Sequence, residues 1–268
     1  MSPIAHTELF KNILRNTVSE TFPKQSRGRP AKITFDIAYD GIRKVVRTGM
    51  PWRCLTSESV SFVTIFKTLH RWSEEHVFER AYKRLLRLYK RTPRHYAIDS
   101  TYVKNQYGRD VVGRNPTDRG RKATKFSVVV DDQGMPFSFL FTGANESDMR
   151  LFDRTLGCAL QTLVPETPMY ADKGYDSRAN RHCAESYGLR DRLFKRRSSN
   201  TRRTHARRGV VERFFAWHDK QRRLVQRYEQ KIHIYASMTF LFAGGLLEKR
   251  VRIESSEHHV LQHQQSMT

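Results

Sequence analysis

Three carboxylates stand at positions where a carboxylate needs a partner or a ligand. Asp99 interrupts the apolar run of HYAIDSTYVK, and a lone carboxylate buried in a sheet is costly unless it is paired or binds a metal. Asp172 follows the short apolar stretch MYA and lies just before a glycine, and Glu212 lies in the aromatic segment VERFFAW. We therefore treat Asp99, Asp172 and Glu212 as one candidate metal-binding set.

Carboxylates are the ligands that metal-dependent phosphoryl chemistry requires. Mg²⁺ and Mn²⁺ prefer oxygen ligands, and two such ions about 4 Å apart activate a water or a 3′-hydroxyl and stabilise the leaving oxygen of an in-line displacement. Each residue alone also has an ordinary interpretation: Asp172 as a turn residue, and Glu212 as a surface ion pair with Arg213 or Arg208. Their order on a strand, a strand end and a following helix favours a shared site for two ions.

The segments around these carboxylates predict an α/β fold, a mixed sheet flanked by helices. β-branched and aromatic stretches predict the strands, and amphipathic spacing predicts the helices. The turn 132–134 joins two strands into a hairpin. The expected order is strand 95–103, hairpin strands 125–131 and 136–141, helix 148–163, strand 168–171, helix 178–187, strand 189–194, helix 208–230 and helix 232–249.

A small all-helical domain is expected before this sheet. Apolar residues recur at helical spacing across 5–90, with Ser59 or Ser61 as the cap of one helix. The segment 24–32 is basic and broken by Gly and Pro, which predicts a loop or a flexible arm. We expect three parts: a helical N-terminal DNA-binding domain at 1–92, a catalytic domain at 93–250 and a flexible tail at 251–268.

The net charge indicates a polyanionic partner. The 268 residues include 49 Lys and Arg against 27 Asp and Glu, which gives a formal charge of +22. Such an excess repels itself in the compact state unless a polyanion is near, so nucleic acid or an anionic membrane surface is indicated. No apolar run approaches the roughly 20 residues of a transmembrane helix. We therefore expect nucleic acid as the partner, and no membrane; the family resemblance described below narrows this expectation to double-stranded DNA.

The cysteines and the first residues bear on the compartment. Cys54, Cys158 and Cys183 form no CxxC pair, so a disulfide framework or a zinc finger is not expected. The first residues lack the basic-then-apolar layout of a signal peptide. We expect reduced thiols, and a cytoplasmic location on a bacterial nucleoid or a nuclear one in a eukaryotic host.

Basic residues cluster in three segments that are candidates for DNA contact. The first leads into the predicted hairpin, the second contains no acid and leads into the predicted Glu212 helix, and the third lies on that helix. A charge run is also typical of a solvated face. The candidates are Arg114, Arg119, Arg121, Lys122, Lys125, Lys195, Arg196, Arg197, Arg202, Arg203, Arg207, Arg208, Lys220 and Arg223.

A set of motifs in a fixed order resembles one family. AIDSTYVK, GRNPTDRGRKATKFSVVVD, GANESDMRLF, YADKGYDS and RRGVVERFFAWHDKQRRLVQRYEQ occur in the order seen in bacterial insertion-sequence transposases of the insertion-sequence-5 type. VRTGMPWRCL and HRWSEEHVFERAY also look like the N-terminal helical region of that family. The resemblance covers roughly residues 35–245, and the ordered set is more specific than any one motif.

The resemblance implies a ribonuclease-H-like catalytic domain with an Asp-Asp-Glu triad. Asp99, Asp172 and Glu212 match the three triad positions. Related enzymes carry a Tyr-x2-Arg-x3-Glu-x6-Lys signature, in which Arg208 and Glu212 match but His205 and Asp219 replace the Tyr and the Lys. This departure leaves the triad intact and concerns the contacts to the phosphates of the transposon ends.

These observations predict a metal-dependent DNA transposase that uses Mg²⁺ or Mn²⁺. The expected partners are the terminal inverted repeats and target DNA, with a homodimer expected because two ends have to be paired. The N-terminal helices are a candidate helix-turn-helix reader of those repeats. Two alternatives stay open: a domesticated or inactive transposase that only binds DNA, and a ribonuclease-H-like nuclease without strand transfer. An RNA-binding role is disfavoured because no stacking-platform motif is present.

Overall fold

A computed structural model describes residues 8–23, 33–55, 60–193 and 202–265, with the side chains of 202–208 and 254–265 left out. The predicted arm 24–32, the alternative cap Ser59 and the basic residues 195–197 lie outside the described part. The chain divides into two compact units. One comprises Met1–Val45, Met50–Arg91 and Ser237–Thr268, and the other comprises Val46–Gly49 and Thr92–Ala236.

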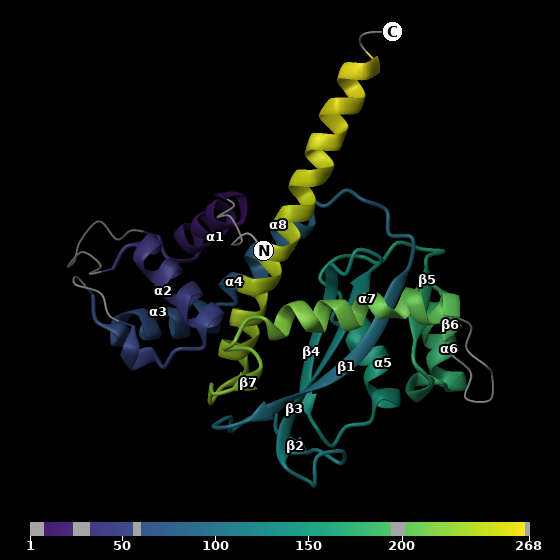
Figure 1. The fold of residues 1–268 in the computed structure, drawn as a ribbon, viewed down its shortest axis with the longest axis horizontal. Helices are drawn as coiled ribbons and strands as arrows, with labels where there is room; N and C mark the ends of the chain where they lie inside the picture. Colours follow the sequence, from purple (N-terminus) through teal and green to yellow (C-terminus); the bar gives the residue numbers. More distant parts are fainter. Residues whose placement is uncertain (1–7, 24–32, 56–59, 194–201, 266–268) are drawn as a thin grey trace. The chain divides into compact units, whose positions relative to one another are not determined.

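The first unit is helical. Phe10 and Leu14 of its first helix are fully buried, and the Phe10 ring lies against Gly244, where an added Cβ would overlap the ring. An ion pair between Arg84 and Glu20 joins the fourth helix to the first. No helix in the described part of the chain is long and apolar enough to cross a membrane. The elements are α1 (Glu8–Thr21), α2 (Phe35–Thr48), η1 (Trp52–Cys54), α3 (Phe62–Glu74), α4 (Val77–Leu86) and, for most of its length, α8 (Ile232–Gln265) (Figure 1).

The second unit is a seven-stranded mixed sheet with helices on both faces. The order is β2-β3-β1-β5-β6, and β4 pairs with β3 while β7 pairs with β1. Strands β1, β5 and β6 run parallel to one another, and β3 runs antiparallel to both β1 and β4. The elements are β1 (Tyr96–Asn105), β2 (Gly113–Arg114), β3 (Lys122–Asp131), β4 (Pro136–Gly143), α5 (Asp148–Gly157), β5 (Pro168–Ala171), η2 (Lys173–Tyr175), α6 (Arg178–Ser186), β6 (Arg190–Leu193), α7 (Arg202–Asp219) and β7 (Gln226–Arg227).

Adjacent residues of β3 show which helix covers which face. The Phe126 ring lies 6.2 Å from the Phe214 ring of α7. The next residue, Ser127, accepts a hydrogen bond of 2.9 Å from the Thr155 hydroxyl of α5. Because successive side chains of a strand point to opposite faces, α7 and α5 cover opposite sides of the sheet (Figure 1).

The predicted hairpin is present and has a local cause. One carboxylate oxygen of Asp131 accepts hydrogen bonds from the backbone N–H groups of Gln133 and Met135. Gly134 adopts φ +79°, a left-handed conformation that glycine tolerates without a Cβ clash. The turn therefore fixes the register of β3 against β4.

Three predicted helix ends differ from the structure. The helix predicted to run from Arg208 to Gln230 ends at Asp219, because Arg223 and Leu224 are drawn into the fold and β7 pairs with β1. Helix α5 stops at Gly157 rather than at residue 163, and Cys158 is its C-cap. Helix α8 continues to Gln265, and its residues from 237 onward cluster with the N-terminal helices rather than with the sheet.

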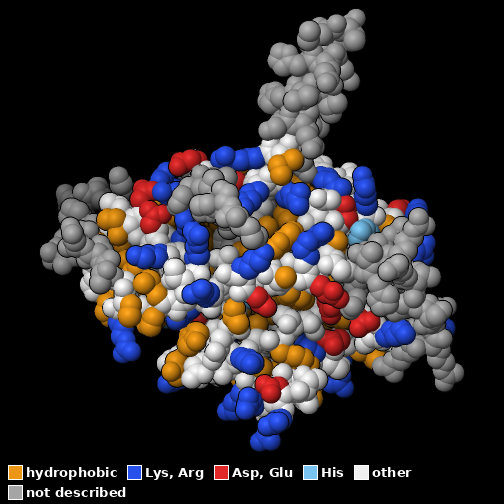
Figure 2. Space-filling model, in the orientation of Figure 1, with side chains coloured by type: hydrophobic (Ala, Val, Ile, Leu, Met, Phe, Trp, Pro, Cys, Tyr) orange, Lys and Arg blue, Asp and Glu red, His pale blue; other side chains and the backbone are white. Residues whose placement is uncertain are grey.

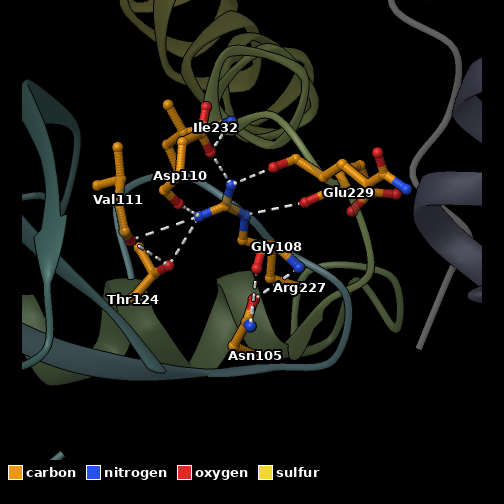
Figure 3. Close-up of polar contacts among 9 residues, drawn as sticks. Asn105, Gly108, Asp110, Val111, Thr124, Arg227, Glu229 and Ile232 are labelled. Atoms are coloured by element: carbon orange, nitrogen blue, oxygen red, sulfur yellow. Dashed lines mark hydrogen bonds and ion pairs between the residues drawn. The ribbon is translucent and has the colours of Figure 1, made fainter. Parts of the chain in front are cut away.

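A buried arginine joins the end of β1 to β3, β7 and the start of α8. Arg227 is fully buried and forms an ion pair with Asp110 (Figure 3). Its guanidinium also donates to the Thr124 hydroxyl at 2.9 Å and to the Glu229 carbonyl at 3.0 Å. The Asp110 carboxylate in turn accepts from the backbone N–H of Ile232. One side chain therefore holds four segments together.

We predict that Arg227→Met destabilises the protein by about 3–5 kcal/mol, because the partly exposed Asp110 loses its charge partner and the Thr124 hydroxyl and Glu229 carbonyl lose their buried donor. Arg227→Lys should recover only part of this loss, since an ammonium does not reproduce the fork of the guanidinium. Urea unfolding measures both values. Arg109→Ala, at an exposed arginine of the same loop, is the control, and an Arg227→Met variant as stable as this control would contradict the prediction.

Candidate active site

The strand register places Asp99 and Asp172 side by side. Strands β1 and β5 are parallel, and Ala97 pairs with Tyr170. Two residues further along each strand, the same register sets Asp99 opposite Asp172. Neighbouring strands lie about 4.8 Å apart, so the two residues lie side by side, with Asp99 as the fourth residue of β1 and Asp172 directly after the last residue of β5. The carboxyl end of a strand such as β5 is where open α/β sheets place their ligands.

Local hydrogen bonds orient both aspartates. One carboxylate oxygen of Asp99 accepts from the backbone N–H of Ser100 at 2.8 Å. Asp172 is the N-cap of η2, and its carboxylate accepts from the backbone N–H of Lys173 at 2.7 Å. Both aspartates are half-buried, so each is held by its own backbone and still reached by solvent.

Glu212, the third candidate, lies on α7. This helix packs against β1, β3 and β5, with Val211 and Phe214 fully buried beneath it. Glu212 itself is exposed. One turn later, the Phe215 ring lies 5.8 Å from Phe126 of β3, so this edge of the helix borders the sheet. Asp99 alternates with Ser100 along β1 and therefore belongs to the face that α7 covers.

The donor chemistry fits a hard divalent cation, because all three candidates offer carboxylate oxygens. Placement supports two of them directly, since the register of β1 against β5 sets Asp99 opposite Asp172. Within the described residues, no group of three or more His, Cys, Asp or Glu side chains stands close enough together to hold a metal ion. The third ligand would have to come from Glu212 on the helix edge.

A fourth carboxylate, Asp148, lies behind Asp99 on the α5 face. The Ser100 hydroxyl donates to Asp148 at 2.5 Å, and the Lys125 ammonium lies 2.8 Å from the same oxygen. Lys125 is only 2% exposed and also donates to the backbone carbonyl of Glu146. A buried cation is thus paired with a carboxylate that is 35% exposed, directly behind the Asp99 strand.

Tyr175 closes the same cluster from the turn after Asp172. Burial raises the pKa of the Tyr175 hydroxyl well above its usual value, and the nearby carboxylates of Asp148 and Asp99 raise it further. The hydroxyl lies beside Ser100 and Ser127 without forming a well-aligned hydrogen bond. The neutral phenol is therefore the form that fits this position.

Four of the proposed DNA-contacting residues lie on the surface near β2 and the start of β3. Figure 2 shows Lys and Arg side chains gathered where Figure 1 places this tip of the sheet. The tip includes a tight turn, with φ +50° at Arg119 and +69° at Gly120. The exposed set, which we call the β2–β3 tip, is Arg114, Arg119, Arg121 and Lys122.

The structure removes two residues from the DNA-contacting set. Lys125 is buried against Asp148 and Glu146 and presents no ammonium to a phosphate. Arg223 is buried and forms an ion pair of 2.8 Å with Glu229. Lys220 is exposed as predicted, but it follows the end of α7 and does not lie on that helix.

The remaining basic candidates fall at or beyond the edge of the described part. Arg202, Arg203, Arg207 and Arg208 lie in the first turns of α7, and their side chains are outside the description. Lys195, Arg196 and Arg197 are outside it entirely. His205 is one of the two residues that depart from the family signature, and its side chain also lies outside the described part. Asp219 is the last residue of α7, 3.1 Å from the buried His218 ring.

Sequence reasoning missed Asp148 and Arg227. Asp148 looked like an ordinary first-turn residue of a helix, and its place in NESD gave no sign of a buried partner. Arg227 looked like one more cation on a long basic helix. No spacing rule finds either contact, because Lys125 and Asp110 are distant from their partners in the chain.

Comparisons with known proteins agree with this architecture. Residues 90–243 match the family described as the transposase DDE domain, and residues 12–82 match putative transposases of the IS4/5 family. The chain is 35% identical over 161 residues to a putative transposase for insertion sequence element IS402 from Burkholderia cepacia, covering 58% of this chain and 74% of that protein.

Among solved structures, a piggyBac transposase synaptic complex with hairpin DNA matches with a TM-score of 0.55 at 9% identity. The match covers 94% of this chain and 74% of that one. Together with the mixed sheet, it confirms the predicted ribonuclease-H-like fold. The family match over 90–243 includes Asp99, Asp172 and Glu212. The chain belongs to the IS4/5-type family of transposases that carry a DDE domain.

Proposed function

We propose that this chain cleaves DNA at the ends of its own insertion element and joins the freed 3′-hydroxyl to target DNA. The observation that carries the proposal is the alignment of Asp99 in β1 with Asp172 at the end of the neighbouring β5, on the face of the sheet that the Glu212 helix covers. Family membership supports a transposase that depends on divalent metal ions. The proposed ions are two Mg²⁺ or Mn²⁺ held by these three carboxylates.

Different residues would hold the metal ions and bind the DNA. When bound, the ions supply charge stabilisation at the scissile phosphate and a nucleophile at neutral pH. Asp99 and Asp172 would hold them from the sheet, where backbone N–H groups already orient one oxygen of each carboxylate. Glu212 would complete the set from α7. The β2–β3 tip and Lys220 would bind the phosphate backbone as point charges.

Joining also requires that two transposon ends meet. We therefore propose that two copies of the chain act together as a homodimer on paired ends. The N-terminal helical unit is proposed to read the terminal inverted repeats, since it is separate from the sheet that carries the carboxylates.

Asp99→Asn, Asp172→Asn and Glu212→Gln should each lower strand cleavage by about 10³-fold or more, because each removes a charged metal ligand. The assay is nicking of an end-containing duplex in Mg²⁺ or Mn²⁺, with DNA affinity and thermal unfolding measured alongside. Affinity and folding should stay close to those of the unmodified chain. Full cleavage by Asp99→Asn would refute the assignment.

The same assay separates the two alternatives. A chain that only binds DNA would show affinity and no metal-stimulated nicking. A nuclease without strand transfer would nick, yet it would leave pre-cleaved ends unjoined when a target plasmid is supplied. Joining of those ends is the result expected here.

Substitutions at the β2–β3 tip should weaken DNA binding with little effect on the protein's own stability. Each of Arg121→Ala and Lys122→Ala should lower the slope of log affinity against log salt by about 1, the value for one phosphate contact. Arg190→Ala, at an exposed arginine on the opposite edge of the sheet, is the matched control. Unchanged slopes for both tip variants would exclude the tip from the DNA interface.

A further inference from the structure

An ion pair built on a buried lysine lies behind the proposed metal site and has no role in the chemistry derived so far. Asp148 accepts a 2.5 Å hydrogen bond from the Ser100 hydroxyl and lies 2.8 Å from the Lys125 ammonium. The Lys125 side chain is 2% exposed and also lies 5.0 Å from the centre of the Tyr102 ring. We call Ser100, Lys125 and Asp148 the Asp148 clamp.

Stability alone does not account for this arrangement. Taking the Lys125 ammonium out of water is costly, and its partner Asp148 is still 35% exposed, so that solvent screens the attraction that offsets this cost. The surroundings offer apolar packing, since Ile98, Phe152 and Leu151 nearby are fully buried. A costly ion pair in such a place is better explained by what it holds in position.

Ser100 links the clamp to Asp99. Its backbone N–H donates to the Asp99 carboxylate at 2.8 Å, and its hydroxyl donates to Asp148. One residue therefore restrains a proposed metal ligand on one face of the sheet and is itself anchored on the other face. Any shift of Ser100 would move the donor that orients the Asp99 oxygen.

The clamp also touches the turn that carries Asp172. A Cβ added at Gly174 would lie 3.8 Å from the Asp148 carboxylate, so the η2 backbone packs close to it. Tyr175 of the same turn is fully buried beside Asp148 and Asp99. Asp148 thus lies behind the part of β1 that carries Asp99 and close to the turn that follows Asp172.

We propose that Ser100, Asp148 and Lys125 are positioning residues, which set the orientation of Asp99 and its spacing from Asp172 for metal binding. Lys125 acts by neutralising Asp148, so that Asp148 holds Ser100 without repelling the two aspartates in front. This inference rests on the proposed function, in which Asp99 and Asp172 hold the ions.

The test compares two serines that make the same kind of bond. Ser100 of β1 donates to Asp148 of α5, and the buried Ser138 of β4 donates to the backbone carbonyl of Thr155 in the same helix. Ser100→Ala removes the clamp bond, and Ser138→Ala is the matched control. Binding of Mn²⁺ alone to the full chain is measured from the resonance signal of free Mn²⁺, together with strand cleavage and thermal unfolding.

Ser100→Ala should weaken Mn²⁺ binding roughly 10-fold to 100-fold, as expected for loss of a group that orients a metal ligand. The kcat for cleavage should fall by a similar factor, while the KM for DNA stays unchanged. Ser138→Ala should change neither quantity, although it should cost similar thermal stability. Ser100→Thr keeps the hydroxyl and should restore Mn²⁺ binding.

Equal Mn²⁺ binding by Ser100→Ala and Ser138→Ala would overturn the proposal. Asp99→Asn, measured in parallel, separates this failure from failure of the proposed function. If Asp99→Asn binds Mn²⁺ normally, the metal site itself is wrongly assigned; if it loses Mn²⁺ and Ser100→Ala does not, only the clamp is refuted. Should Ser100→Ala fail to fold, Ser100→Cys keeps the shape and weakens the donor, with the same two outcomes.

Discussion

The buried guanidinium of Arg227 is the contact on which the sheet unit depends. Its bonds reach Asp110 after β1, Thr124 in β3 and the Glu229 carbonyl before α8, so distant segments are fixed by a single side chain. A Cβ at Gly108 would lie 2.8 Å from the guanidinium carbon, so the loop after β1 closes tightly around this group. Strand β1 carries Asp99 in its first half. The contacts of Arg227 hold the chain just after the other end of β1, and in this way they support the site.

The strong positive charge serves two different purposes in this chain. Arg227, Arg223 and Lys125 are buried and neutralised by Asp110, Glu229 and Asp148. Arg121 and Lys122 at the β2–β3 tip stay exposed. The formal charge of +22 already subtracts the acids in these pairs and still indicates a polyanionic partner. What the buried pairs reduce is the number of basic residues that can reach such a partner.

Much of the sheet followed from local sequence pattern, whereas the helix ends and buried cations did not. β-branched, aromatic and apolar stretches and the turn 132–134 predicted β1, β3, β4 and β5 close to their observed bounds, since a strand's own residues set those signals. The end of α7 depends on Arg223 and Leu224 turning inward, which is a tertiary effect that overrides helix propensity. Lys125 resembled a surface cation because its partner lies 23 residues away on another element, a separation that no periodicity encodes.

Alternation along β1 explains why the site needs support from behind. Asp99 and Ser100 are neighbours in the chain and belong to opposite faces, so the face under α7 can hold metal ligands while the face under α5 holds their restraints. On the α7 face, Asp99 and Asp172 stand opposite each other on neighbouring strands, and their negative charges repel until a cation binds. A backbone held from the opposite face keeps them aligned against that repulsion. The neutralised Asp148 supplies such a hold without adding a third uncompensated charge.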